Sequence, residues 1–221
     1  MTGRRIRVML VDDHAVVREG YRRLLERQPD MEVAAEARDG TEAYRTYRAA
    51  EPDVVIMDIS MPGRGGIDAI RQIRQVDPDA RILVFSVHAA VSYALQAIRA
   101  GARGYITKSS ASELLIDAVR SVFNNKLTLC AEISHLLAAS RLEEQPSPID
   151  LLSPREFEIL RMILDARHTD AIAVDLSLSP KTVANYHYAI KSKLGVSSDV
   201  ELVYYCIRCG LIDPFSVVGA I

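Results

Sequence analysis

Three carboxylates and one lysine in the first half of the chain each follow a short, largely apolar run. Asp12 and Asp13 follow residues 8–11, Asp58 follows residues 54–57, and Lys108 follows residues 104–107. Such runs, alternating with longer helical patterns, are typical of buried strands in a parallel sheet. A parallel sheet brings the ends of its strands to one edge, so we expect these four side chains to meet there. Converging carboxylates repel unless a cation holds them, and oxygen ligands suit Mg²⁺. The pattern therefore predicts a magnesium site.

The elements that would position these residues form five strand–helix repeats within residues 4–124. The expected strands lie near 5–11, 31–37, 53–58, 80–86 and 104–107, and the expected helices near 14–27, 40–50, 66–76, 91–100 and 111–124. Strict alternation of this kind indicates right-handed crossovers and a doubly wound α/β fold. We therefore predict a five-stranded parallel sheet with helices on both faces.

The chain changes character after residue 124. A further helix is expected at 131–141, and the Pro-, Ser- and Glu-containing stretch 143–148 is typical of a linker. From Leu151 onward the patterns indicate short helices only. The predicted organisation is an α/β domain at 4–124, a linker with a helix at 125–149, and an all-α domain of four helices at 150–214.

Two helix starts in the second domain are well marked. Ser153, Pro154 and Glu156 form a capping box with proline at the first helical position. The first expected helix begins at Pro154, with Phe157, Leu160 and Ile163-Leu164 at core spacing. The others follow at about 169–176, 181–194 and 198–209, the third of the four opened by Ser179 and closed by Gly195. Two helices joined by a short turn, the second well capped, predict a helix-turn-helix.

Composition narrows the class of protein further. The chain has 221 residues, no tryptophan, and no apolar stretch near the roughly 20 residues needed to span a bilayer. Three cysteines, an odd number, fit a reducing compartment, so we expect a cytoplasmic protein with no membrane partner. Cys206 and Cys209 form a C-x-x-C inside a helix without a second pair of ligands, and we interpret them as small apolar residues.

Several of these segments resemble a known family. Residues 11–14 (VDDH), 57–62 (MDISMP) and 104–108 (GYITK) resemble a response-regulator receiver domain. Residues 152–156 (LSPRE), 181–183 (KTV) and 192–196 (SKLGV) resemble a LuxR-type helix-turn-helix. Over nearly its whole length the chain is similar to the NarL/FixJ class of two-component transcription regulators.

The resemblance implies a role for each residue at the sheet edge. Asp58 would be the phosphoacceptor, and Mg²⁺ would be held by Asp13, the Asp58 carboxylate and the backbone carbonyl of Ser60. Asp12 would bind the ion directly or through water. A cation there neutralises charge on the phosphoryl oxygens during transfer. A receiver assists its own phosphorylation but has no independent substrate, so it is not an enzyme in the usual sense.

The same resemblance identifies phosphoryl contacts and a switch. Ser86 and Lys108 would contact the phosphoryl group, and Ser86 with Tyr105 would form the switch, because the hydroxyl gains a partner only after phosphorylation. His88, two residues past Ser86, is expected to lie in a solvent-facing loop and to shield the acyl phosphate partly from water.

The third helix of the second domain would enter the DNA major groove. Its spacing predicts that Val183, Tyr186, Ile190 and Leu194 face the domain core. The outward residues are the predicted DNA contacts: Lys181 and Thr182 for phosphate, and Ala184, Asn185, Tyr188, Lys191 and Ser192 on the groove face. The partners implied are a histidine kinase, promoter DNA and, on activation, a second copy of the chain.

Charge complicates DNA binding. From Asp150 onward the chain has seven lysines and arginines against nine aspartates and glutamates, a net charge of −2. DNA-binding domains usually carry a basic footprint, so the affinity of one copy should be weak and dimerisation should be needed. The apolar stripe of Val200, Val203, Tyr204 and Ile207 fits either a core or a dimer contact.

Three alternatives stay open at this point. The aspartates could simply cap helices or occupy turns. The acidic second domain could bind a protein, which would make the chain a phosphorylation-controlled adaptor. A haloacid-dehalogenase-like phosphatase also uses an aspartyl phosphate, but its D-x-D motif after the first strand is replaced here by Asp12-Asp13-His14.

Overall fold

The computed structural model describes residues 4–140 and 147–212. The chain divides into two compact units, Met1–Ala139 and Ser140–Ile221. Residues 141–146 of the predicted linker, which include the last residue of the helix expected at 131–141, lie outside the described residues, as do residues 213 and 214 of the predicted second domain. None of the described helices is long and apolar enough to cross a membrane.

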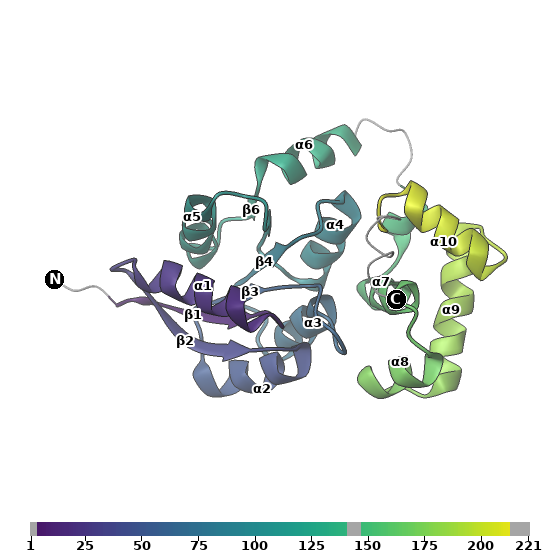
Figure 1. Ribbon diagram of the computed structural model, residues 1–221, viewed down its shortest axis with the longest axis horizontal. Helices are drawn as coiled ribbons and strands as arrows, with labels where there is room; N and C mark the ends of the chain where they lie inside the picture. Colours follow the sequence, from purple (N-terminus) through teal and green to yellow (C-terminus); the bar gives the residue numbers. More distant parts are fainter. Residues whose placement is uncertain (1–3, 141–146, 213–221) are drawn as a thin grey trace. The chain divides into compact units, whose positions relative to one another are not determined.

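The first unit is built on a parallel sheet (Figure 1). Its strand order is β2-β1-β3-β4-β5-β6. The strands are β1 (Ile6–Val11), β2 (Met31–Ala37), β3 (Val54–Met57), β4 (Ile82–Ser86), β5 (Gly104–Thr107) and β6 (Thr128–Leu129). The prediction of a parallel sheet is confirmed.

The predicted number of strands was wrong by one. The sixth strand, β6, pairs in parallel with β5, with Gly104 opposite Thr128 and Tyr105 opposite Leu129. It consists of two half-buried residues at the sheet edge. A segment this short carries no alternation of apolar and polar residues, so the sequence gives no periodic signal for it.

Helices cover both faces of the sheet. Figure 1 shows α1 and α5 on one face, with α2 and α3 on the other, and α4 packs beside α3. The helices of this unit are α1 (Ala15–Glu26), α2 (Gly40–Ala50), α3 (Gly66–Val76), α4 (Val91–Ala100), α5 (Ser112–Phe123) and α6 (Ala131–Ser140). Because both faces are covered, every residue of β3 and β4 is buried.

The strand order fixes where a ligand can bind. From β1 the chain moves outward to β2, then returns to the other side of β1 for β3, β4 and β5. Helices that leave β1 and β3 therefore start on opposite faces, and a crevice forms at the carboxyl ends of these two strands. Asp12 and Asp58 stand at those two ends.

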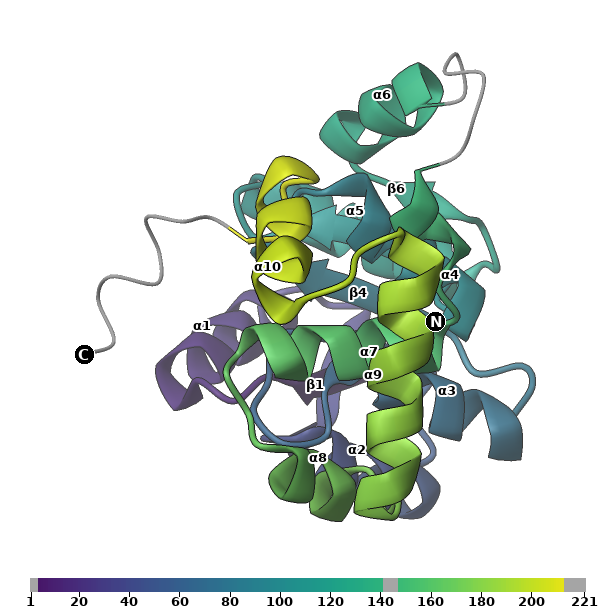
Figure 2. The ribbon, with the colours of Figure 1, turned by 90° about the vertical axis from the view of Figure 1, so that its right-hand side faces the viewer.

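Within the described residues 147–212, all regular elements of the second unit are helical. Its elements are a 3₁₀ turn η1 (Pro148–Leu151) and the helices α7 (Pro154–Leu164), α8 (Thr169–Asp175), α9 (Pro180–Leu194) and α10 (Asp199–Arg208). Figure 2 shows α8 beside the start of α9, the arrangement of a helix-turn-helix. Phe157, Ile190 and Leu202, each at most 2% exposed, form part of its core.

The caps explain where these helices begin and end. The capping box at the start of α7 is confirmed: Ser153 accepts from the Glu156 backbone, and Glu156 accepts from the Ser153 backbone. Ser179 caps α9 by accepting from the Thr182 backbone. Gly195 ends α9 in the left-handed region, with φ of 69°, where glycine has no steric cost.

Candidate functional site

The carboxylates predicted to converge do lie at one edge of the sheet. Asp12 follows β1 and Asp58 follows β3, and these residues are only 5% and 2% exposed. The Asp58 backbone N–H donates to the Val11 carbonyl at 2.9 Å, which ties the two loops together. The backbone therefore holds these two buried carboxylates close together, although their like charges repel.

Lys108 joins these two carboxylates. Its Nζ lies 2.6 Å from Oδ2 of Asp12 and 2.6 Å from Oδ2 of Asp58. Burial alone would lower the pKa of the Lys108 ammonium, but the hydrogen bonds to Asp12 and Asp58 outweigh it and raise that pKa. Lys108 is therefore charged at neutral pH and offsets part of the negative charge of the site.

Asp13 provides a further oxygen at this edge. One ligand atom each of Asp12, Asp13 and His14 lie within 4.8 Å of one another. The buried Oδ1 of Asp13 is 2.9 Å from Nδ1 of His14 but lacks hydrogen-bond geometry with any described residue. A buried carboxylate oxygen without such a partner, next to other carboxylates, fits a hard cation such as Mg²⁺.

The other predicted metal ligand, Ser60, has a visible role in the Asp58 loop. The Ser60 backbone N–H donates to Oδ1 of Asp58 at 3.0 Å. That bond leaves Oδ2 of Asp58 to Lys108 and fixes the orientation of the carboxylate. Ser60 Oγ is buried and makes no hydrogen bond within the described residues.

Gly66 holds the same loop against helix α3. A Cβ added at Gly66 would lie 2.1 Å from the Asp58 carbonyl oxygen and 2.8 Å from the Ile59 Cα. Real side chains never approach backbone so closely, so the start of α3 can pack on this loop only without a side chain at that position. Gly66 was not among the predicted site residues, and its positioning role follows from the structure alone.

The predicted switch residues lie together in the interior. Ser86 and Tyr105 are both 0% exposed. The Tyr105 hydroxyl donates to the His88 carbonyl at 2.8 Å, and the His88 backbone N–H donates to Oγ of Ser86 at 3.2 Å. Burial raises the pKa of Tyr105, and its contact with Ser86 opposes this only in part. Tyr105 is therefore a neutral donor that points inward.

His88 is less exposed than expected. Its ring stacks on Tyr93 of α4, with 4.0 Å between ring centroids and 2° between the planes. The expectation of a solvent-facing residue was wrong, because the histidine is half-buried against this aromatic ring. Its shielding of the acyl phosphate stays a prediction.

Two residues of α1 complete the site and were not predicted. Arg18 donates to the Asp12 carbonyl at 2.7 Å, and Tyr21 meets Phe85 edge-on with 4.9 Å between ring centroids. Both residues line a small hollow beside Asp12 and Asp58. Their spacing of four and seven residues from His14 is the signal that could have found them, since such residues share one helix face.

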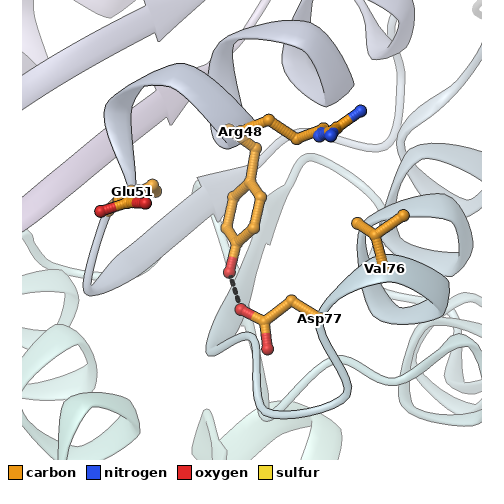
Figure 3. A pocket seen from close by; sticks show the side chains of 6 residues that line it. Arg48, Glu51, Val76 and Asp77 are labelled. Carbon is orange, nitrogen blue, oxygen red and sulfur yellow. Dashed lines mark hydrogen bonds between the residues drawn. The ribbon is translucent and has the colours of Figure 1, made fainter.

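A second hollow lies at the other edge of the sheet (Figure 3). It is lined by Tyr47, Arg48, Glu51, Pro52, Val76 and Asp77, at the ends of α2 and α3. The Tyr47 hydroxyl donates to Asp77 there, and burial followed by this bond raises the Tyr47 pKa. The carboxyl-terminal ends of the helices in this fold lie at the edge of the sheet opposite to the carboxyl ends of the strands, so this hollow is remote from Asp58.

In the second unit, α9 presents the predicted outward face. Val183, Ile190 and Leu194 are buried and Tyr186 is half-buried. Lys181, Ala184, Asn185, Tyr188 and Ser192 are exposed, whereas Thr182 and Lys191 are half-buried. Tyr188, 76% exposed, is the large apolar side chain that stands farthest out on this face. The periodicity of the helix is as predicted, and its DNA contacts stay predictions.

Most basic side chains of this unit already have an acidic or carbonyl partner. The pairs are Arg155 with the Leu176 carbonyl, Arg161 with Glu158 and Asp165, Arg167 with Asp175, Lys191 with Asp199, and Lys193 with Glu156. Of the three lysines on α9, Lys191 and Lys193 are thus held by carboxylates. Lys181, at the start of the helix, is exposed and makes no ion pair among the described residues.

The two units match two family models. Residues 8–120 match the response regulator receiver domain, and residues 150–206 match the bacterial regulatory proteins of the luxR family. The chain belongs to the response regulators. It combines a receiver domain with a LuxR-type DNA-binding domain. This membership excludes the haloacid-dehalogenase-like phosphatase considered above.

Relatives of known type match over nearly the whole chain. The response regulator UvrY of Escherichia coli K12 is 40% identical over 93% of this chain and 95% of its own length. The response regulator GacA of Pseudomonas aeruginosa is 38% identical over 96% of this chain and 100% of its own. Both comparisons extend through the receiver and the DNA-binding domain.

Solved structures give the same result. RcsB from Salmonella enterica serovar Typhimurium, bound to the promoter rprA with a phosphomimetic, is 25% identical and matches with a TM-score of 0.73. That match covers 91% of this chain and 98% of RcsB. A LuxR-family response regulator from Aurantimonas is 50% identical over 63% of this chain and 99% of its own, with a TM-score of 0.62.

Proposed function

We propose that a histidine kinase phosphorylates this response regulator on Asp58 and that the phosphorylated chain binds promoter DNA as a dimer. The observation that carries the proposal is the position of Lys108, with 2.6 Å from its Nζ to both Asp58 and Asp12 at the carboxyl edge of the sheet. An ammonium at that point is placed to neutralise charge on an incoming phosphoryl group.

The transfer is a simple exchange of bonds. A carboxylate oxygen of Asp58 forms a new bond to phosphorus while the N–P bond to the kinase phosphohistidine breaks, and the imidazole nitrogen keeps the electron pair. Ser60 holds Oδ1 of Asp58, at 3.0 Å, so Oδ2 is the oxygen that faces the ammonium. Lys108 can follow the phosphoryl oxygens because its chain is flexible and its other partner, Asp12, stays fixed.

Mg²⁺ is the cofactor that fits these ligands. Asp12, Asp13 and Asp58, with the Ser60 carbonyl, would hold the ion, which would supply further neutralisation of the phosphoryl charge. The support is the all-oxygen ligand set and the buried Asp13 Oδ1, which makes no hydrogen bond with a described residue. Arg18 of α1 donates to the Asp12 carbonyl, and His14, at the N-cap of α1, lies 2.9 Å from Asp13, so both residues would help to fix the loop that follows β1.

The signal would leave the site through Ser86 and Tyr105. A phosphoryl group on Asp58 offers the Ser86 hydroxyl a strong acceptor, and a side chain that turns to donate to it would move Oγ away from the His88 N–H, from which it now accepts. The Tyr105 hydroxyl donates to the His88 carbonyl, so a shift of this loop would move the acceptor of the tyrosine. Dimers are supported by a relative, since RcsB was solved as dimers bound to DNA.

The phosphorylation step can be tested directly. The purified chain, incubated with Mg²⁺ and acetyl phosphate, should gain one phosphoryl group by intact mass, and Asp58→Asn should gain none. Asp53→Asn is the matched control, because Asp53 precedes β3 at the opposite edge and pairs with Arg4 at 2.8 Å. Equal labelling of wild type and Asp58→Asn would refute Asp58 as the acceptor.

A further inference from the structure

The start of α10 brings a carboxylate against the DNA-facing helix. Oδ1 of Asp199 accepts a hydrogen bond from Nζ of Lys191 at 3.0 Å. The same oxygen lies 2.9 Å from Nε2 of His187. These two partners are one helical turn apart on α9, so Asp199 spans both from outside the helix.

Lys191 belongs to the face of α9 proposed to meet DNA. It follows Tyr188 by three residues, and the two side chains therefore share one face of the helix. The Asp199 side chain is 65% exposed, whereas those of Lys191 and His187 are 23% and 24% exposed. An approaching phosphate would therefore meet the carboxylate beside the lysine.

The electrostatics of the cluster favour the pair in the free protein. The hydrogen bond from Lys191 is the main cause that lowers the pKa of Asp199, and the charge of Lys191 and the contact with His187 add to it. The position of Asp199 in the first turn of α10 also suits a negative charge. Asp199 is thus ionised at neutral pH, and Lys191 is engaged before DNA arrives.

We propose that Asp199 limits the DNA affinity of this response regulator by holding Lys191 and His187 away from the phosphate backbone. The inference rests on the proposed DNA binding through α9. Affinity for DNA depends on cations that replace condensed counterions, and each one that is engaged elsewhere does not contribute. Because the pair is exposed, DNA can compete with it, so Asp199 tunes affinity rather than blocking binding.

The pair of Lys191 with Asp199 has a larger effect on DNA affinity because few other basic side chains of the second unit are available to DNA. Arg161, Arg167 and Lys193 are bound to carboxylates, and Lys181 alone among the α9 lysines has no ion pair in the described part of the unit. Release of one further lysine would therefore be a large relative gain in available positive charge. A weak single copy leaves binding dependent on dimerisation, and hence on phosphorylation.

The test uses Asp199→Asn in the full chain. The probe is a fluorescein-labelled duplex of about 20 base pairs of mixed sequence, titrated with Mg²⁺ and acetyl phosphate present at about 50 to 200 mM salt. We expect Asp199→Asn to bind about three- to tenfold more tightly, with a salt slope steeper by about 0.9 per chain. Asparagine keeps the shape of the side chain and Ser198 still caps the helix, so the fold is retained.

Two controls separate the local effect from a change in net charge. Asp165→Asn removes the same charge from the end of α7, where Arg161 stays bonded to Glu158, and it should leave the affinity within about twofold. In a His187→Ala, Lys191→Ala background, Asp199→Asn should give no gain, because the groups that it would release are absent.

Each possible outcome of this experiment either supports or overturns the inference. An unchanged or weaker affinity for Asp199→Asn overturns the inference, as does an equal gain in Asp165→Asn or a gain that persists without His187 and Lys191. If neither wild type nor Asp199→Asn binds the duplex at the lowest salt, the proposed DNA binding itself fails and the inference fails with it.

Discussion

The Lys108 ammonium lies 2.6 Å from an Asp58 carboxylate oxygen, although the two residues are 50 positions apart in the chain. The contact exists because β3 and β5 both end at the same edge of the sheet, with β4 between them. Lys108 neutralises part of the charge of the carboxylates, and in the proposed function it would also contact the incoming phosphoryl group.

Those two roles predict opposite effects of Lys108→Met. Without the ammonium, the carboxylates should attract Mg²⁺ more strongly, by about three- to tenfold in affinity. Phosphorylation should slow by about 10²-fold, because a group that stabilises the developing charge is lost. Calorimetric Mg²⁺ titration and the rate of phosphoryl incorporation measure the two effects, with exposed Lys126→Met as the control. Weaker Mg²⁺ binding in Lys108→Met would contradict this account.

Gly66 and Gly20 should respond to alanine in opposite directions. Gly66→Ala would force a Cβ to 2.1 Å from the Asp58 carbonyl, so we expect a loss of roughly 1–3 kcal/mol of stability and slower phosphorylation. Gly20 lies in α1 with no atom within 4 Å of an added Cβ, so Gly20→Ala should gain about 0.5–1 kcal/mol. Urea unfolding of the two variants checks both signs. Stabilisation by Gly66→Ala would be incompatible with the close packing of α3 on the Asp58 loop.

The ion pair of Glu156 with Lys193 predicts a pH dependence for the second unit. Burial would raise the pKa of Glu156, but the hydrogen bonds from Lys193 and Ser153 outweigh it and lower that pKa below its ordinary 4.5. A carboxyl with a lowered pKa stabilises the fold above its ordinary value and loses this contribution as the pH falls through the lowered one. The second unit should therefore weaken below about pH 4.5.

Amide hydrogen exchange of α7 and α9 in the full chain measures this effect. Glu156→Gln should reduce the protection of both helices at pH 7 by about 1 kcal/mol, the typical contribution of a cap. Its exchange should also depend less on pH than that of wild type. An equally steep pH dependence in Glu156→Gln would show that another group is responsible.

Lys181 and Asn185 should affect DNA binding differently. Lys181→Ala should weaken binding to every duplex and reduce the salt slope by about 0.9, since it removes a phosphate contact. Asn185→Ala should cost about 1–3 kcal/mol at one base pair and leave the salt slope unchanged. Anisotropy titrations on a duplex selected from a random library, and on single-base variants of it, distinguish the two. Equal losses on all duplexes for Asn185→Ala would exclude a base contact.

The parts of the fold that the sequence predicted are those with a repeating signal. Apolar runs at residues 54–57 and 82–85 indicated buried strands, and the parallel arrangement then placed Asp58 near Asp12 and Lys108. The Ser153 capping box and Gly195 marked helix ends correctly because capping is a local interaction. In each case the relevant contacts lie within one turn of a helix or follow from the sheet alone.

Contacts between separate helices and strands could not be predicted from the sequence. Strand β6 is too short for a periodic pattern, and the stacking of His88 on Tyr93 depends on where α4 packs. The pair of Lys191 with Asp199 joins two helices across a turn, so its geometry follows from packing rather than spacing. The charge count indicated weak DNA affinity, but only the structure identified which cations are engaged.

The most direct test of the central claim is promoter-fragment binding by the full chain with Mg²⁺, with and without acetyl phosphate, compared with Asp58→Ala. The account predicts salt-sensitive binding that strengthens with the phosphodonor in wild type and does not respond to it in Asp58→Ala. Labelling of Asp58 without DNA binding, even at about 50 mM salt, would contradict the account and favour a protein-binding adaptor.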